Sequence, residues 1–390
     1  KIVYKSPRYK ELFHQKENLK EHNWIKSFTS QDLRDLQIHF NIGWSGNGLI
    51  QNSLFIKKLI EKDRNFTEEE KQQLLTEQKE YLLKVKNFIK SLALNPNIEV
   101  SVTPFYHPII PVMNDIDNVQ KSWENSVIPN NFNTLKYYSQ KHIENAVDFS
   151  VNYFGKKVNG MWPAEGSVSH DFIELINNKI DWIATDEAIL MKSMKRSLSI
   201  DELSSPYKYK NTYMFFRNHS LSDKIGFVYS NWNKEDSAKD FLNELNHIRS
   251  ILTKENALVT VILDGENAWE YYENNGEPFL QHLFEVLSST EWLNLTTFSE
   301  YIHQNKNNIP VLEHLTPGSW IDGNFNTWIN EPTKNKYWSI LFHLQSIIEN
   351  LQKNNLIDSE LFKEVEKYFM IAQGSDWMWW AGEGHSSAND

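Results

Sequence analysis

The chain has 390 residues, enough for one large domain or two of ordinary size, and 40% hydrophobic with 23% charged residues is typical of a soluble globular protein. A net charge of −11, with both signs interspersed, argues against nucleic acid or an anionic membrane as the main partner, because either would require a basic face. No apolar run approaches the ~20 residues of a membrane span, and the lack of cysteine excludes disulfides and thiolate chemistry.

The first strong structural signal is a long helix. Residues 67–70 read TEEE, and Thr67 followed three residues later by Glu70 has the form of a capping box. The apolar positions that follow predict a helix of many turns. The next segment, residues 97–107, alternates as a strand does and ends in prolines. Helical spacing resumes at about 133–153.

Strand-like runs that end in acidic or aromatic residues then alternate with helices. Strands are predicted at residues 181–187, 215–219, 225–229, 259–263 and 295–298, and helices at 169–178, 235–252 and 277–289. This order is typical of a parallel α/β barrel or a doubly wound sheet, where chemistry lies at the carboxyl ends of strands. Acids occupy that position at Glu165, Asp186 with Glu187, and Asp264 with Glu266. After about residue 305 two helical patterns follow, at 333–352 and 358–373.

Three chemistries compete for these acids. The thirteen histidines include no pair at i,i+3 or i,i+4, so a metal would need His107, Asp186 and His219 to converge from separate strand ends. No Gly-x-Ser-x-Gly elbow supports a serine nucleophile, and no P-loop supports phosphate binding. We therefore expect neither a metal nor a cofactor.

The third chemistry is cleavage of a glycosidic bond, which needs one ionised carboxylate and one protonated acid. Glu165 and Asp264 each follow a strand-like run and stand near a tryptophan, Trp162 and Trp269 respectively. A helix N-cap is the structural alternative for either acid alone. The 14 Trp, 16 Tyr and 22 Phe suit sugar faces, although a core rich in aromatic residues explains the same composition.

Seven motifs run along the chain in a fixed order. They are NIEVSVTPFYHPIIP (97–111), GMWPAEGSVS (160–169), WIATDE (182–187), FRNHSLSDKIGF (216–227), LDGENAWEYY (263–272), GSWIDGNFNTWI (318–329) and GSDWMWW (374–380). In this order they resemble glycoside hydrolase family 57, and within it the α-amylase and amylopullulanase branch. Seven colinear motifs are far more specific than any one of them.

The resemblance implies a fold and a catalytic pair. The fold would be α/β, with an incomplete (β/α)7 barrel over residues 1–305 and a mainly helical domain over 306–390 that completes the cleft. The mechanism would be retaining, with Glu165 as the nucleophile and Asp264 as the general acid/base. Such carboxyl groups lie ~5–5.5 Å apart, with the nucleophile ionised and the pKa of the acid raised.

The resemblance also suggests residues that bind the sugar. Trp162 is the candidate stacking platform beside the cleaved bond. The candidates for hydrogen bonds to sugar hydroxyls are His107, Asp186, Arg217 and His219. Trp320 and Trp328 are expected to form a wall of the cleft. Glu266 is expected to raise the pKa of Asp264. Trp269 could line the cleft or pack against a helix. Trp377, Trp379 and Trp380 could also line the cleft or pack, and packing is favoured, while Asp376 and Glu383 are left undecided.

One family motif is missing. The family begins with His-Gln-Pro on its first barrel strand, but the only His-Gln here, His14-Gln15, is followed by Lys16 in a polar, helix-like context. Because the chain also begins without Met, we expect a fragment that lacks the first strand and a pocket histidine, and that is poorly active or unstable.

The leading function is therefore hydrolysis of α-1,4-glucosidic bonds in starch- or glycogen-type glucans, with α-1,6 bonds as a further substrate. The alternatives are 4-α-glucan transfer and glucan binding without catalysis, although a binder needs neither carboxylate. The expected partner is an α-glucan, with no nucleic acid and no membrane. The oligomeric state stays open, and the expected location is the cytoplasm.

Overall fold

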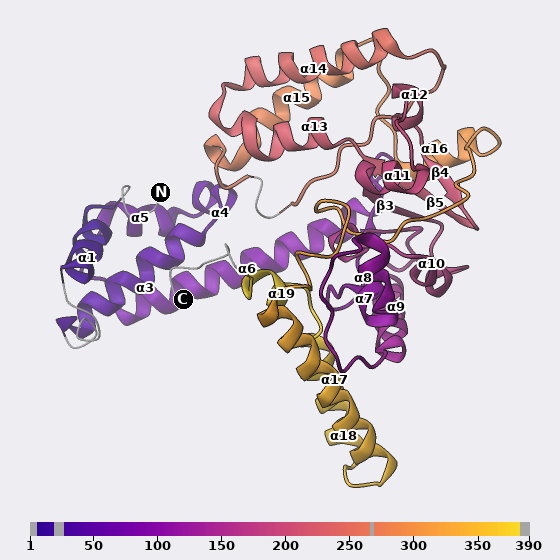
Figure 1. The fold of residues 1–390 in the computed structure, drawn as a ribbon. Helices are drawn as coiled ribbons and strands as arrows, with labels where there is room; N and C mark the ends of the chain where they lie inside the picture. Colours follow the sequence, from indigo (N-terminus) through magenta and orange to yellow (C-terminus); the bar gives the residue numbers. More distant parts are fainter. Residues whose placement is uncertain (1–5, 19–26, 266–268, 383–390) are drawn as a thin grey trace. The chain divides into compact units, whose positions relative to one another are not determined.

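Figure 1 shows a computed structural model of the chain, and the residues described below are 6–18, 27–265 and 269–382. The chain divides into two compact units. The N-terminal unit comprises residues 1–94 and 269–278, and the sheet unit comprises residues 95–268 and 279–390. Each unit is described by itself. None of the helices in the described part of the chain combines the length and apolar character of a membrane span.

The described secondary structure of the N-terminal unit is helical. Its helices are α1 (Pro7–Glu17), α3 (Ser30–Trp44), α4 (Asn47–Asn52), α5 (Leu54–Lys62), α6 (Glu68–Leu92) and the 3-10 turn η4 (Glu273–Gly276). The capping box predicted at the start of α6 is confirmed. The backbone N–H of Glu70 donates to Thr67 Oγ1 over 3.2 Å, and that of Thr67 donates to Glu70 Oε2 over 2.7 Å. His14, which we did not accept as the missing motif, lies on α1 with an exposed side chain.

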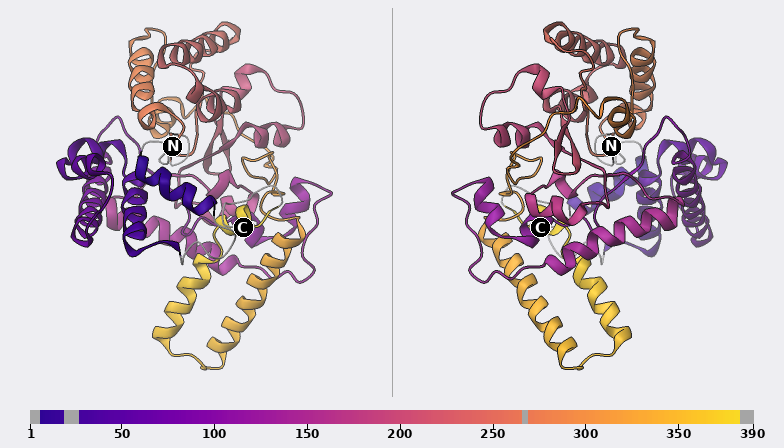
Figure 2. Two further views of the ribbon diagram at one scale, coloured as in Figure 1. Left: turned by 90° about the vertical axis from the view of Figure 1, so that its left-hand side faces the viewer. Right: turned by 90° about the vertical axis from the view of Figure 1, so that its right-hand side faces the viewer.

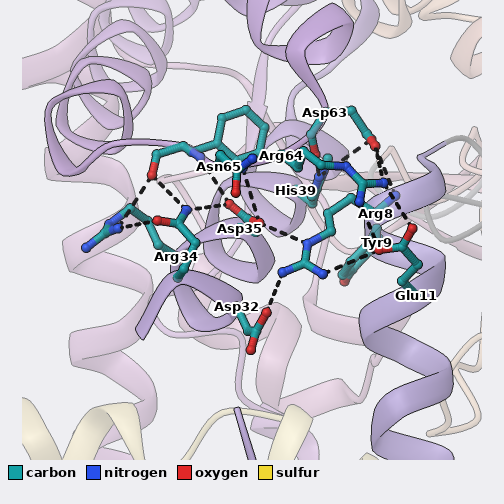
Figure 3. Close-up of polar contacts among 12 residues, drawn as sticks. Arg8, Tyr9, Glu11, Asp32, Arg34, Asp35, His39, Asp63, Arg64 and Asn65 are labelled. Carbon is teal, nitrogen blue, oxygen red and sulfur yellow. Dashed lines mark hydrogen bonds and ion pairs between the residues drawn. The ribbon is translucent and has the colours of Figure 1, made fainter. Parts of the chain in front are cut away.

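A buried carboxylate joins the parts of this unit (Figure 3). The Asp35 side chain is fully buried on α3, and its Oδ2 accepts from Arg8 Nε of α1 over 2.9 Å. Its Oδ1 accepts from the backbone N–H of Phe66 over 3.1 Å and from Gln31 Nε2 over 2.9 Å. A buried carboxylate is stable only when such partners replace water. Asp35 therefore links α1, α3 and the turn that leads into α6.

The sheet unit is built on one five-stranded sheet within the described residues, in the order β1-β2-β3-β5-β4. The strands are β1 (Ser101–Val102), β2 (Gly160–Met161), β3 (Trp182–Asp186), β4 (Tyr207–Tyr209) and β5 (Thr212–Arg217). The neighbours β1, β2, β3 and β5 pair in parallel, and β4 pairs antiparallel to β5. The register places Asp186 beside Arg217 at the carboxyl ends of β3 and β5.

The sheet unit also contains many helices (Figure 1). Before β5 they are α7 (Ile110–Asn114), α8 (Asp117–Ser122), α9 (Lys136–Phe154), the 3-10 turn η1 (Ala164–Gly166), α10 (His170–Ile176), α11 (Glu187–Met194) and α12 (Ile200–Leu203). After β5 they are α13 (His219–Asp223), the π-helix η2 (Lys224–Val228), η3 (Tyr229–Asn231), α14 (Lys234–Ile251), α15 (Glu277–Ser289), whose first two residues are grouped with the N-terminal unit, and α16 (Phe298–Asn305). The helices predicted from the sequence at 133–153, 169–178, 235–252 and 277–289 are confirmed by α9, α10, α14 and α15.

Both faces of the central strand are buried. On one face Ile183 joins a core with Met161 of β2 and Phe172 of α10. On the other face Trp182 packs with Phe215 of β5 and with Phe298 of α16, at ring-centroid distances of 5.9 and 4.5 Å. A parallel strand buried on both sides reads as a continuous apolar run, which is why β3 was recognisable.

The other strand predictions were only partly right. Of residues 97–107 only Ser101–Val102 form a strand, and of the run 259–263 only Thr260 pairs, in an isolated bridge to Arg217. The prediction at 295–298 is wrong, because Thr297 caps the start of α16.

The prediction at 225–229 is also wrong. Ile225 and Tyr229 are both buried four residues apart, in the helical turns η2 and η3. A short apolar run fits that spacing as well as it fits a strand.

The C-terminal region is helical, as predicted. It contains α17 (Pro332–Lys353), α18 (Ser359–Ile371) and α19 (Asp376–Trp380). Figure 2 shows α17 and α18 as a hairpin that extends away from the sheet. The α/β class with a helical C-terminal region is thus confirmed, whereas the described strands form a sheet with two edges, and a closed seven-stranded barrel is not among them.

We predict that Asp35→Asn lowers the free energy of unfolding of the full chain by about 2 kcal/mol. The NH2 group of the new amide would face the N–H groups that now donate to the Asp35 carboxylate, and it cannot accept from them. Urea unfolding followed by circular dichroism measures this change. The matched control is Glu80→Gln on the exposed face of α6, which should change stability by less than about 0.5 kcal/mol. Equal stability of the two variants would contradict a role for Asp35 in holding the unit together.

Candidate active site

A cavity of about 760 Å³ lies in the sheet unit. Three carboxylates line it, those of Glu165, Asp264 and Asp376. The aromatic residues in its lining are Trp162, Trp182, Phe298, Trp320, Trp379 and Trp380. Carboxylates beside aromatic rings in a cavity of this size are typical of a binding or catalytic site for a polar ligand that also has apolar faces.

Glu165 occupies a strained turn directly after β2. Its φ of 56° and ψ of 29° lie in the left-handed region, and Gly166 follows with a φ of 57°. A Cβ on Gly166 would lie 3.0 Å from atoms of both Trp162 and Trp320. Left-handed backbone is unfavourable for a residue with a side chain, so the surrounding contacts must hold the turn.

Two donors from the C-terminal region hold the Glu165 carboxylate. Trp320 Nε1 donates to Oε2 over 3.1 Å, and Ser375 Oγ donates to Oε1 over 3.0 Å. The backbone N–H of Trp320 also donates to the Glu165 carbonyl over 3.0 Å. His107 Nδ1 lies 3.6 Å from Oε1. Both carboxylate oxygens are therefore fixed by residues more than 150 positions away in the sequence.

Short backbone pairings bring these donors into place. Val168 and Gly318 form an antiparallel bridge, with N–H to O distances of 2.8 and 3.1 Å. A Cβ on Gly318 would lie 2.5 Å from the carbonyl oxygen of Gly323, so this approach requires glycine. Pro108 pairs with Gly374 in a second antiparallel bridge. The first bridge positions the segment of Trp320, and the second positions the segment of Ser375.

Burial raises the pKa of Glu165 to about 7. The hydrogen bonds from Ser375 and Trp320 act in the opposite direction, and the negative charges of Asp264 and Asp376 raise the pKa further. The sequence led us to expect an ionised carboxylate at this position. The raised pKa places the ionisation of this carboxyl near neutral pH, and the ionised nucleophile stays a prediction.

Asp264 reaches the same cavity from the irregular segment that follows α14. That segment runs beside β5 without forming a strand. The backbone N–H of Asn218 donates to the Thr260 carbonyl over 2.7 Å, and Arg217 Nε donates to the Ile262 carbonyl over 2.8 Å. Asp264 follows two residues after Ile262 and lines the cavity with Glu165. Glu266 falls outside the described residues.

The predicted aromatic platform is in the cavity. The rings of Trp162 and Trp320 meet edge to face, with centroids 5.4 Å apart and planes at 78°. The Arg217 guanidinium lies 5.3 Å from the Trp320 ring centroid. Trp162, Trp320 and His107 therefore line the cavity, and Arg217 supports one wall of it, while their predicted contacts with a sugar stay predictions.

Three predicted sugar-binding residues instead form a polar network outside the cavity lining. Asp186 is fully buried and caps α11 by accepting from the backbone N–H of Ala188 over 2.9 Å. Arg217 is buried with its Nη1 3.4 Å from Asp186 Oδ2. His219 Nε2 lies 2.9 Å from Asp223 Oδ2. Asp186, Arg217 and His219 are therefore not among the residues that line the cavity, and their predicted contacts with a sugar stay predictions.

The other tryptophans named from the sequence lie in different parts of the structure. Trp328 is fully buried in the core, and its Nε1 donates to Ser319 Oγ over 3.1 Å, so it does not line the cleft. Trp379 and Trp380, for which we favoured packing over the cleft, line the cavity. Trp269 belongs to the N-terminal unit, where it packs against Tyr272.

Sequence reasoning missed Ser375 and left the role of Asp376 undecided. Both lie in the motif GSDWMWW, whose combination of small, acidic and aromatic residues after a helix was the available signal. No group of three or more His, Cys, Asp or Glu side chains in the described ranges is arranged to hold a metal ion.

We predict that Glu165→Gln stabilises the protein at pH 8 but not at pH 5. A carboxyl whose pKa rises from 4.5 to about 7 on folding makes the folded state lose stability as pH increases through this range. The neutral amide avoids that loss, which is on the order of 2 kcal/mol at pH 8. Urea unfolding at both pH values measures the difference, with Glu364→Gln as the exposed control. A variant that is no more stable than the wild type at pH 8 would contradict the raised pKa.

Comparisons with known proteins identify a family from the sequence and a fold from solved structures. The family model described as "Glycosyl hydrolase family 57" matches residues 4–312. A branching enzyme of this type from Pyrococcus horikoshii has 15% sequence identity and a TM-score of 0.61, over 97% of this chain and 80% of that chain. A branching enzyme from Thermococcus kodakaraensis, solved with glucose, has 13% identity and a TM-score of 0.62, over the same shares of the two chains.

A third similar structure is the α-amylase AmyC from Thermotoga maritima. It has 14% identity and a TM-score of 0.59, over 100% of this chain and 84% of that chain. At such identities these likenesses show the fold alone. The comparison with curated proteins gives no match. Because the family model covers most of its length, the chain belongs to glycosyl hydrolase family 57.

Proposed function

We propose that this chain is a retaining glycoside hydrolase that cleaves α-1,4-glucosidic bonds in starch- or glycogen-type glucans. The observation that carries the proposal is the placement of Glu165 and Asp264 on one cavity walled by tryptophan. Family membership supplies the reaction class, and the cavity supplies the two carboxyl groups that the reaction requires. A protein that only binds glucan would need neither acid.

In the proposed first step, the ionised carboxylate of Glu165 attacks the anomeric carbon while Asp264 gives its proton to the departing glycosidic oxygen. The C–O bond to the leaving chain breaks as the bond to Glu165 forms. In the second step, Asp264 removes a proton from water, which displaces Glu165 from the same carbon. Two inversions at one carbon retain the α configuration.

The aromatic walls suit the proposed substrate. Glucose rings present C–H faces, and flat indole rings offer a matching apolar surface with a polar edge. The Trp162 and Trp320 rings meet edge to face, so their planes face in two different directions. Each plane would stack on one of two successive sugar rings in a bent chain. Hydrogen bonds to the sugar would come from His107, Asp376 and the catalytic pair itself.

Transfer of the glucan to a second sugar hydroxyl is the other candidate. Two of the similar structures are branching enzymes, and branching replaces water by a sugar as acceptor. Trp379 and Trp380 add an aromatic surface at the cavity, and Trp380 is 57% exposed. That surface would bind an acceptor chain by stacking. The same covalent intermediate on Glu165 serves hydrolysis and transfer.

Analysis of products from amylose, maltooligosaccharides and pullulan separates these functions. Hydrolysis raises the number of reducing ends and shortens the chains. Transfer redistributes chain lengths or introduces α-1,6 branches with few new reducing ends. Pullulan cleavage would add α-1,6 hydrolysis. Failure to change any of these glucans would overturn the proposed function.

We predict that Glu165→Gln and Asp264→Asn each lower kcat at least about 10³-fold, because each removes a group that acts on the reacting atoms. Maltosyl fluoride, whose leaving group needs no proton, should restore the first step in Asp264→Asn but not in Glu165→Gln. The exposed variant Glu364→Gln serves as the control and should keep wild-type rates. Wild-type turnover by either cavity variant would show that its role is misassigned.

The pH dependence offers a further prediction. Attack requires ionised Glu165, so kcat/KM should increase with pH and level off above about 7, the pKa of this group. A pH–rate profile on a short maltooligosaccharide measures the position of this acidic limb. An acidic limb whose midpoint lies near pH 4.5, the ordinary pKa of glutamate, would contradict the assignment of Glu165 as the buried nucleophile.

A further inference from the structure

The hydroxyl of Ser375 lies between two residues of the cavity. Its Oγ is 3.0 Å from Glu165 Oε1 and 2.8 Å from His107 Nδ1. Ser375 is 1% exposed, directly before α19. Neither the proposed reaction nor the motifs gave this residue a role.

The proton arrangement in this chain follows from elementary hydrogen-bond chemistry. When Glu165 is ionised, as the proposed reaction requires, its carboxylate can only accept, so the single proton of the Ser375 hydroxyl points to Glu165. The hydroxyl oxygen can then only accept from His107. The proton of His107 must therefore sit on Nδ1, which fixes the tautomer of a ring that also lines the cavity.

The backbone around Ser375 leaves it little freedom to move. Its N–H donates to the His107 carbonyl over 2.9 Å. A Cβ on Gly374 would lie 2.8 Å from the Tyr106 carbonyl oxygen, so the two segments are in close contact. One residue earlier, the Gln373 side chain is buried with its Oε1 2.8 Å from His142 Nε2. The hydroxyl is thus preorganised rather than recruited by a ligand.

We propose that Ser375 is a positioning residue for the reaction described above: it orients the Glu165 carboxylate and holds His107 as the Nδ1–H tautomer. This inference rests on the proposed function. Trp320 Nε1 fixes the other oxygen of Glu165, so the two donors together set the plane of the carboxylate. Without Ser375, the carboxylate would keep one anchor and could rotate away from the anomeric carbon.

The charged and titratable groups that face Glu165 are His107, Asp264 and Asp376. Removal of the Ser375 hydroxyl leaves all three in place and deletes one donor that favours the ionised form of Glu165. The pKa of Glu165 should then rise further, and the acidic limb of the rate profile should move to higher pH.

The test compares Ser375→Ala with Ser375→Thr. A hydrogen bond to a charged group contributes ~1.5–3 kcal/mol, so Ser375→Ala should lower kcat by about 10- to 100-fold with little change in KM. Its acidic limb should shift upward, and Ser375→Thr, which keeps the hydroxyl, should restore both. Ser139→Ala removes a buried hydroxyl on α9 that bonds to the Leu135 carbonyl, and as the control it should change neither.

Nitrogen NMR of histidine-labelled protein gives a readout that does not depend on turnover. Above pH 7, where Glu165 is ionised, His107 should show the Nδ1–H tautomer in the wild type and lose it in Ser375→Ala, with His107→Gln used to assign its signal. An unchanged tautomer and an unchanged acidic limb in Ser375→Ala would overturn the inference. A tautomer that depends on Ser375 in a chain without glucan activity would instead overturn the proposed function and leave this hydrogen-bonded arrangement standing.

Discussion

The Glu165 carboxylate, held in a left-handed turn by donors from two distant segments, is the constraint around which the sheet unit is organised. The turn is unfavourable by itself, and it persists because Trp320 and Ser375 donate to the two oxygens of the carboxylate. The same bonds draw the C-terminal region over the carboxyl ends of the strands. A cavity forms at that junction.

This arrangement couples stability to chemistry. Burial of Glu165 among aromatic rings raises its pKa, which makes the ionised folded state less stable at neutral pH. A desolvated carboxylate is also a better nucleophile, because less water must leave before it reaches the anomeric carbon. The hydrogen bonds from Trp320 and Ser375 keep the pKa low enough for the ionised form to exist near pH 7.

The sequence predicted the elements whose signals are local. The capping box at Thr67 identified α6, and the apolar run that became β3 was recognised because burial on both faces leaves no polar alternation. The segment before Asp264 was predicted as a strand, but it makes only an isolated bridge at Thr260. Ile225 and Tyr229 fit strand and helix alike, so the sequence had no means to choose between them.

What the sequence by itself determined is the family, the two candidate carboxylates and the tryptophans beside them, since these are fixed by motif and order. Only the tertiary structure decided which residues share the cavity. Asp186 and Arg217 lie at the carboxyl ends of strands, as catalytic residues often do, but they form a buried ion pair with each other. Ser375, 210 residues after Glu165, touches its carboxylate. A contact of that kind depends on backbone pairings between remote segments, and no local pattern encodes it.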